Sequence, residues 1–213
     1  MRDTTFGIYI DDYQPRGRQD GVYTLSKRAF DITVSLSLLP VFIIISIALL
    51  ILNPWANKGP LLYRQCRMGR HCQPFMVYKF RSMLPADAIL RGANDPLEHD
   101  RITWLGAFCR KFRLDEIPQI INVLKGEMSL VGPRPCLFNQ EELIRERESR
   151  GVLESRPGIT GLAQVNDIDM STPELLAETD KRMLENLNLG AYFKYILMTV
   201  AGKGAGDRVP GRD

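Results

Sequence analysis

The sequence has few cysteines and histidines, which limits the metal chemistry that it can support. Its 213 residues include four cysteines and two histidines, and no two cysteines form a CxxC pair. Structural zinc sites are built mostly from such pairs, so the sequence does not predict a zinc-binding fold. We interpret the four cysteines as reduced thiols in a cytoplasmic setting.

Acidic residues are absent from two stretches that are rich in lysine and arginine. Residues 58–81 contain six Lys or Arg and residues 101–113 contain four, with no Asp or Glu in either stretch. The net charge of the whole chain is only +3, so these clusters are local. Such clusters bind phosphates, anionic lipid head groups or nucleic acid, or form a solvated basic face.

Charge is missing altogether from residues 32–52, a run long enough to cross a bilayer as a helix. Pro40 lies near its centre, where proline removes a backbone donor and kinks or breaks a helix. Ser35 and Ser37 are expected to bond the freed carbonyls. Because Lys and Arg flank the run evenly on both sides, their charges do not indicate which end of a spanning helix would face the cytoplasm. The residues alone leave open a kinked spanning helix and a helix that re-enters the same face.

The rest of the chain predicts a mainly helical fold with a little β structure. Residues 74–83 predict a strand and residues 64–73 predict a turn, and together they indicate a hairpin carrying Arg67, Arg70, Lys79 and Arg81. Apolar periodicity predicts helices within residues 101–112, 114–126, 139–151 and 172–187. Residues 190–202 suit either an amphipathic helix in the membrane interface or a packing helix.

Two adjacent carboxylates, Asp115 and Glu116, follow a group of cations where the helix predicted for residues 114–126 begins. Asp115 as the N-cap would contribute about 1 kcal/mol. Capping leaves the second acid, the cations and the GPRP turn at 132–135 unexplained. A helix start ringed by arginines suits phosphate. A carboxylate held ionised there is a candidate nucleophile toward phosphorus, a magnesium ligand, or both.

Four stretches together resemble the bacterial sugar transferases, the monotopic phosphoglycosyl transferases: KRAFDITVSLSLLP, YRQCRMGRHCQPFMVYKFRSM, DRITWLGAFCRKFRLDEIPQIINVLKGEMSLVGPRP and RPGITGLAQVN. The resemblance covers most of residues 27–166. It implies transfer of a sugar 1-phosphate from a UDP-sugar to undecaprenyl phosphate with release of UMP, which starts the assembly of a membrane-bound glycan. We favour an N-acetamido sugar over a plain hexose.

The resemblance also implies an organisation: an N-terminal arm (1–25), a re-entrant membrane helix (26–53) broken at Pro40, and a catalytic domain (54–213). The catalytic domain is expected at the cytoplasmic face of the inner membrane, with interfacial amphipathic helices. The expected partners are the UDP-sugar, undecaprenyl phosphate and membrane phospholipids, with room for a homodimer and no nucleic acid.

Roles for individual residues follow from the same resemblance. Asp115 and Glu116 are the expected catalytic pair and act with Mg²⁺; Asp115 is both a metal ligand and the nucleophile that forms a covalent phosphosugar intermediate. Binding of phosphates and nucleotide is implied for Lys79, Arg81, Arg113, Pro133, Arg134 and Pro135. The chain departs from the family at Cys72, where a glycine is frequent, and near Tyr192, where an acid is usual.

Other functions explain less of the sequence. A multispan phosphoglycosyl transferase does not fit a single long apolar run. A membrane-tethered nucleic-acid-binding protein would use the basic clusters but leaves the acid pair without a role. A catalytically silent scaffold does not account for an intact acid pair.

Overall fold

The structure is a computed structural model that describes residues 21–57, 59–84 and 101–204. Most of these residues are helical, and the strands form two sheets of two strands each. The predicted α+β, mainly helical fold is therefore confirmed. The predicted N-terminal arm lies largely outside the described residues.

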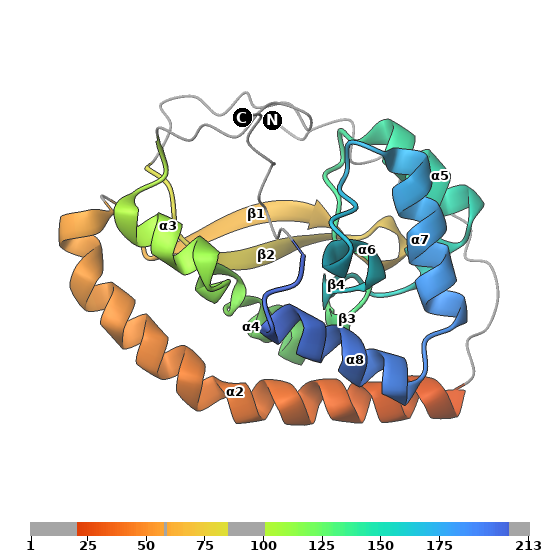
Figure 1. Ribbon diagram of the computed structural model, residues 1–213, viewed down its shortest axis with the longest axis horizontal. Helices are drawn as coiled ribbons and strands as arrows, with labels where there is room; N and C mark the ends of the chain where they lie inside the picture. The colour runs from red at the N-terminus through yellow and green to blue at the C-terminus, as the bar shows by residue number, and fades with distance from the viewer. Residues whose placement is uncertain (1–20, 58, 85–100, 205–213) are drawn as a thin grey trace.

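The long apolar helix α2 (Gly21–Ala56) runs along one side of the molecule and bends about half way along its length (Figure 1). Within the described part of the chain it is the one helix long and apolar enough to cross a membrane. The helix continues through Pro40, so the predicted break is a bend. The expectation for the serines is wrong: Ser37 donates to the carbonyl of Val34 and not to that of Leu36, which the proline leaves without its usual donor. The buried Ser35 hydroxyl has no hydrogen-bond partner among the described residues.

The first half of α2 is held by polar contacts to the rest of the chain. Arg28 donates from its two terminal nitrogens to the carbonyls of Val123 and Leu124, at 2.6 and 2.9 Å. The Asp31 carboxylate, which is buried, accepts from the backbone amide of Leu130 at 3.0 Å and from the Tyr192 hydroxyl. Burial, and then the charge of Asp31, raise the pKa of Tyr192. This tyrosine thus anchors α2.

The second half of α2 also packs against the rest of the chain, which forms one domain. Leu49 packs in a buried cluster with Phe80 and Leu105. The Asn57 side chain, just after the helix, donates to the Arg81 carbonyl at 3.0 Å and accepts from the Thr103 hydroxyl at 2.5 Å. Both ends of the bent helix therefore lie against one domain, as Figure 1 shows.

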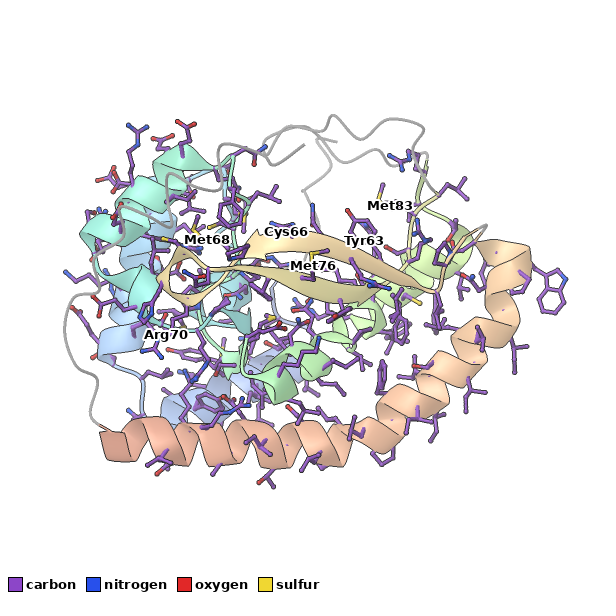
Figure 2. All side chains as sticks on the ribbon, turned by 180° about the vertical axis from the view of Figure 1, so that it is seen from behind. Tyr63, Cys66, Met68, Arg70, Met76 and Met83 are labelled. Atoms are coloured by element: carbon purple, nitrogen blue, oxygen red, sulfur yellow. The ribbon has the colours of Figure 1, made fainter. Side chains whose placement is uncertain are left out.

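The predicted hairpin is confirmed, with a shorter second strand and a shorter turn than expected. Strand β1 (Leu62–Met68) pairs antiparallel with β2 (Pro74–Phe80), as Figure 2 shows. The register places Tyr63 opposite Lys79. Half of the segment predicted as a turn is therefore strand. The connection is tight, and Cys72 has a φ of 58°, in the left-handed region that favours glycine. This conformation suits the glycine that the family resemblance implies at this position.

A second sheet was not predicted. Strand β3 (Ser129–Val131) pairs in parallel with β4 (Gly158–Thr160), and both are largely buried. The pairing is so close that a Cβ on Gly158 would lie 2.0 Å from the Gly132 amide nitrogen. The sheet therefore brings the GPRP turn beside the RPG segment at 156–158.

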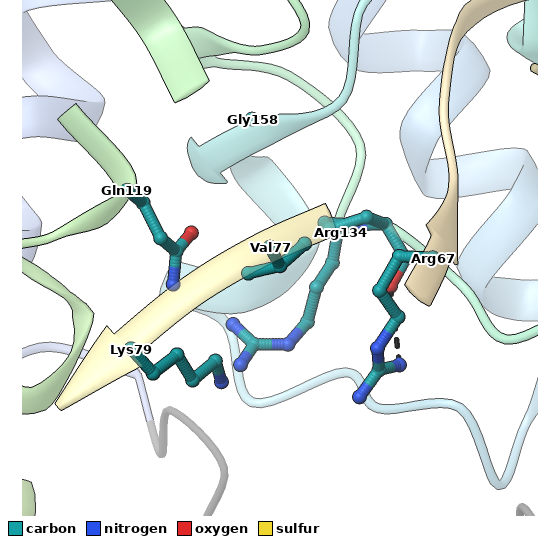
Figure 3. Close-up of a pocket in the computed structure, with 7 residues that line it drawn as sticks. Arg67, Val77, Lys79, Gln119, Arg134 and Gly158 are labelled. Carbon is teal, nitrogen blue, oxygen red and sulfur yellow. Dashed lines mark hydrogen bonds between the residues drawn. The ribbon is translucent and has the colours of Figure 1, made fainter. Parts of the chain in front are cut away.

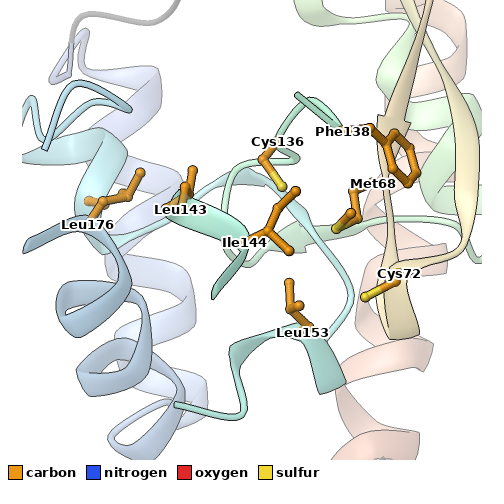
Figure 4. Close-up of a cluster of buried hydrophobic side chains, with 9 residues drawn as sticks. Met68, Cys72, Cys136, Phe138, Leu143, Ile144, Leu153 and Leu176 are labelled. Atoms are coloured by element: carbon orange, nitrogen blue, oxygen red, sulfur yellow. The ribbon is translucent and has the colours of Figure 1, made fainter. Parts of the chain in front are cut away.

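The helices that cover these sheets are α3 (Trp104–Lys111), α4 (Gln119–Lys125), α5 (Glu141–Ser149), α6 (Leu162–Val165), α7 (Pro173–Glu185) and α8 (Leu189–Val200). Four of them confirm helices predicted from periodicity: α3, α4, α5 and α7. Helices α5 and α7 pack together, and Leu143, Ile144 and Leu176 form a buried cluster with Met68 of the hairpin (Figure 4).

Candidate functional site

The acid pair lies in a 3₁₀ turn, Leu114–Glu116, between α3 and α4. Arg113, which precedes the turn, has φ 55° and ψ 21°, in the left-handed region, so it separates α3 from the turn. Asp115 and Glu116 are each only 5% exposed. Asp115 was predicted as the cap of a helix starting at 114, and this is wrong: α4 begins at Gln119, with Pro118 at its N-cap and no side-chain cap. Capping therefore does not explain either acid.

The Glu116 carboxylate joins three separate elements. Its Oε1 accepts from Arg134, in the GPRP turn, at 2.8 Å and from the Lys79 ammonium, on β2, at 3.3 Å. All three side chains are less than one-fifth exposed. Hydrogen bonds between charged groups in such places are stronger than neutral ones. The sequence separates these residues by up to 55 positions, and the fold collects them at one point.

A pocket next to this cluster is lined by Arg67, Val77, Lys79, Gln119, Arg134, Pro135 and Gly158. Figure 3 shows the charged ends of Lys79 and Arg134 close together beside β2, with Arg67 on the other side of Arg134. Three cations around one pocket create a positive potential that suits an anionic ligand. A ligand with several phosphate oxygens matches this set of donors best.

The backbone of the GPRP turn is fixed on both sides of Arg134. The Pro133 carbonyl accepts from the Gly158 amide at 2.8 Å. The Pro135 carbonyl accepts from Arg67 at 3.3 Å, the contact drawn as a dashed line in Figure 3. The two prolines thus shape the turn through their carbonyls and restricted φ angles.

Two of the predicted substrate-binding arginines, Arg81 and Arg113, donate to backbone carbonyls away from the acid pair. Arg81 donates from Nε to the Pro60 carbonyl at 2.9 Å. Arg113 donates to the carbonyls of Lys203 and Gly204, which follow α8. These two guanidiniums thus bond backbone carbonyls in the structure, whereas Lys79 and Arg134 lie at Glu116.

Two polar pocket residues were not predicted as site residues. Arg67 was recognised only as a cation of the hairpin, because nothing in its local sequence says which way it points. Gln119 lies three residues after Glu116 at the start of α4 and is buried. A polar residue at a buried helix position was the signal that could have identified it.

The surroundings of Asp115 bear on the expected metal. Burial, and next the charge of Asp115, raise the pKa of the Cys109 thiol to about 11, so this neighbour is not a thiolate ligand at neutral pH. Within the described ranges, no group of three or more His, Cys, Asp or Glu side chains gathers to hold a metal. Mg²⁺ commonly uses one or two carboxylates together with phosphate oxygens of a substrate. The acid pair fits that mode of binding.

The apolar helix is consistent with membrane association, and the pocket beside the buried acid pair has cationic donors that suit an anionic ligand. Comparison with known sequences is more specific. Residues 22–203 match the bacterial sugar transferase family, and the chain belongs to that family.

Individual relatives agree with this assignment. The chain is similar to the uncharacterized sugar transferase EpsL of Bacillus subtilis, with 38% identity over 82% of this chain and 85% of the relative. It is 42% identical to the undecaprenyl-phosphate galactose phosphotransferase of Salmonella typhimurium, over 68% of this chain and 34% of the relative. It is 34% identical to an Aeromonas hydrophila undecaprenyl-phosphate N-acetylgalactosaminephosphotransferase, over 86% of this chain. The chain spans less than half of the last two proteins.

Proposed function

We propose that this protein transfers a sugar 1-phosphate from a UDP-sugar to undecaprenyl phosphate and releases UMP, and so begins the assembly of a membrane-bound glycan. The observation that carries the proposal is the cluster of Lys79, Glu116 and Arg134 at a cationic pocket, next to Asp115. Relatives named for this reaction with galactose and with N-acetylgalactosamine support it.

The proposed reaction has two displacements at one phosphorus atom. A carboxylate oxygen of Asp115 bonds to the sugar-bearing phosphorus, and the bond from that phosphorus to the bridging oxygen breaks, so UMP leaves with the electron pair. An oxygen of undecaprenyl phosphate then bonds to the same phosphorus, and the bond to Asp115 breaks. The product is the lipid diphosphate sugar, and the carboxylate is restored. A covalent intermediate lets both phosphate substrates use the same cations in turn.

The chain's own groups have distinct tasks in this scheme. Lys79 and Arg134 neutralise and orient the phosphate oxygens, which is the main requirement of phosphoryl transfer. Glu116 keeps these two cations together until the substrate arrives. Asp115 is also the residue that would hold Mg²⁺, which when bound would offset the negative charge of the diphosphate.

The proposed setting is the cytoplasmic face of the inner membrane, with α2 re-entering on the side from which it came. Both ends of α2 lie against one domain, and this supports a helix that does not cross. Large apolar side chains are exposed on three helices: Leu36, Ile43, Ile44, Ile47, Ile51 and Trp55 of α2, Trp104 and Phe108 of α3, and Phe193 and Leu197 of α8. Soluble domains rarely expose so many, so these helices suit the bilayer and its interface.

A topology measurement tests the setting. Cysteines introduced at Leu25 and Trp55, both well exposed near the two ends of α2, are labelled in spheroplasts with a membrane-impermeant maleimide. We expect neither to react until the cells are opened. Reaction of the Leu25→Cys protein alone in intact spheroplasts would show a crossing helix.

A substrate panel tests the reaction. Purified protein in detergent is mixed with undecaprenyl phosphate, Mg²⁺ and one UDP-sugar at a time, and UMP is measured. We expect one or two sugars to be strongly preferred, and chelation of Mg²⁺ to stop UMP release. Failure of every UDP-sugar, with protein that remains folded, would exclude the proposed reaction. The panel includes glucose, galactose and their N-acetamido forms, and so identifies the sugar.

A further inference from the structure

A buried ion pair lies behind the GPRP turn, outside the pocket. Arg147 of α5 donates to Oδ2 of Asp180 on α7 through two nitrogens, at 3.0 and 2.7 Å. The two residues are 2% and 0% exposed. Burial by itself lowers the pKa of the Arg147 guanidinium, but the charges and hydrogen bonds of Asp180 and Cys136 together outweigh it, so the pKa is raised and the side chain stays charged.

Stability alone is a poor explanation for such a pair. Removing two charges from water has a large cost, and well-packed apolar residues often replace buried ion pairs without loss of stability. The apolar cluster shown in Figure 4 lies next to the pair, with Leu143 and Ile144 on α5 and Leu176 on α7. In addition, the second oxygen of Asp180 has no hydrogen-bond partner in the described part of the chain. An apolar pair would satisfy this packing at least as well.

The third contact of Arg147 is with the GPRP turn of the candidate site. Its NH1 donates to the backbone carbonyl of Arg134 at 2.8 Å. The carbonyls of Pro133 and Pro135 are held by Gly158 and Arg67, so three successive carbonyls of the turn each have a fixed donor. Arg147 holds the middle one, on the residue whose side chain reaches Glu116.

We propose that Arg147, oriented by Asp180, is a positioning residue that holds the backbone of Arg134 so that its guanidinium points into the phosphate-binding pocket. The inference rests on the proposed function, because it assumes that Arg134 binds phosphate. Arginine is required because its planar group can direct two nitrogens at a carboxylate and a third at a carbonyl. A lysine at 147 keeps the charge and loses this geometry.

The proposal predicts that Arg147 acts only through Arg134, and a double-mutant cycle measures this. The variant Arg147→Met with Asp180→Leu replaces the pair with apolar residues of similar size. We expect kcat/KM for UMP release to fall by about 10- to 100-fold in the native background. In an Arg134→Ala background the same change should cost less than about threefold, because the side chain to be positioned is gone.

A matched control comes from the residue that caps the C-terminal end of the same helix. Arg150 follows α5 and pairs with Glu146 and with Glu178 of α7, so it links the same two helices at the surface. Arg150→Met should leave kcat/KM within about threefold of the native value, since surface ion pairs contribute little. If the double variant does not fold, Arg147→Lys is measured in both backgrounds in its place.

The possible results distinguish the positioning role of Arg147 from the proposed function of the protein. Equal losses in the native and Arg134→Ala backgrounds would mean that the pair is structural, and would overturn the inference. An unchanged kcat/KM for the folded variant would do the same, while leaving the proposed function intact. A native protein that releases no UMP from any UDP-sugar would overturn both, because no phosphate-binding arginine would remain to be positioned.

Discussion

Arg134 and Arg113 were predicted to bind substrate alike, and the structure predicts different results for their removal. Arg134→Ala deletes a contact of 2.8 Å to the buried Glu116 and leaves that carboxylate with Lys79 at 3.3 Å. A hydrogen bond to a charged group is worth about 1.5–3 kcal/mol, so kcat/KM should fall by about 10- to 150-fold. Arg113→Ala deletes contacts to the carbonyls of Lys203 and Gly204, on a half-exposed side chain, and should cost less than about fivefold.

The assay is the initial rate of UMP release at subsaturating UDP-sugar, with each variant's thermal melting followed in detergent. Melting separates loss of the site from loss of the fold. Arg113→Ala should lower the melting temperature slightly, because it releases the segment after α8. Near-native kcat/KM for Arg134→Ala, or equal losses in both variants, would refute the assignment of Arg134 to the phosphate-binding site.

Three further predictions concern the fold. Gly158→Ala should destabilise the protein by about 1–3 kcal/mol or more, because the added Cβ would meet the Gly132 backbone. Gly190→Ala in α8 should be tolerated, and denaturant unfolding of both variants measures the difference. Pro40→Leu should straighten α2 and make a cysteine at Leu25 reactive from outside in some molecules; unchanged labelling would contradict this. The buried Cys109 thiol should stay protonated at pH 8, because its pKa is raised to about 11. Mass spectrometry should therefore show that iodoacetamide alkylates Cys109 only after unfolding.

Periodicity predicted the helices because their buried stripes are local features of the sequence. The β3–β4 sheet was missed for the opposite reason. Its strands have three residues each, are buried on both faces and so show no alternation, and they pair across an intervening helix. Pro40 lies inside α2, which bends without breaking, and the extent of the bend depends on how both halves pack against the domain.

The site shows a similar limit. Sequence motifs identified the acid pair and the GPRP turn, but they do not determine side-chain direction. Arg113 adopts a left-handed conformation and turns toward the C-terminal segment, whereas Arg134 turns toward Glu116. The contribution of Arg147 has no sequence signal at all, since it arises from the packing of α5 on α7.

The central claim is that Asp115 becomes covalently attached to the sugar phosphate. The most direct test mixes the protein with Mg²⁺ and a UDP-sugar labelled in the sugar, without lipid acceptor. We expect UMP in an amount comparable to the protein, with the label on the peptide that contains Asp115. Asp115→Asn is nearly isosteric and caps no helix, so it should fold normally, carry no label and lose several orders of magnitude in turnover. Near-native turnover by the folded Asp115→Asn protein would contradict the account.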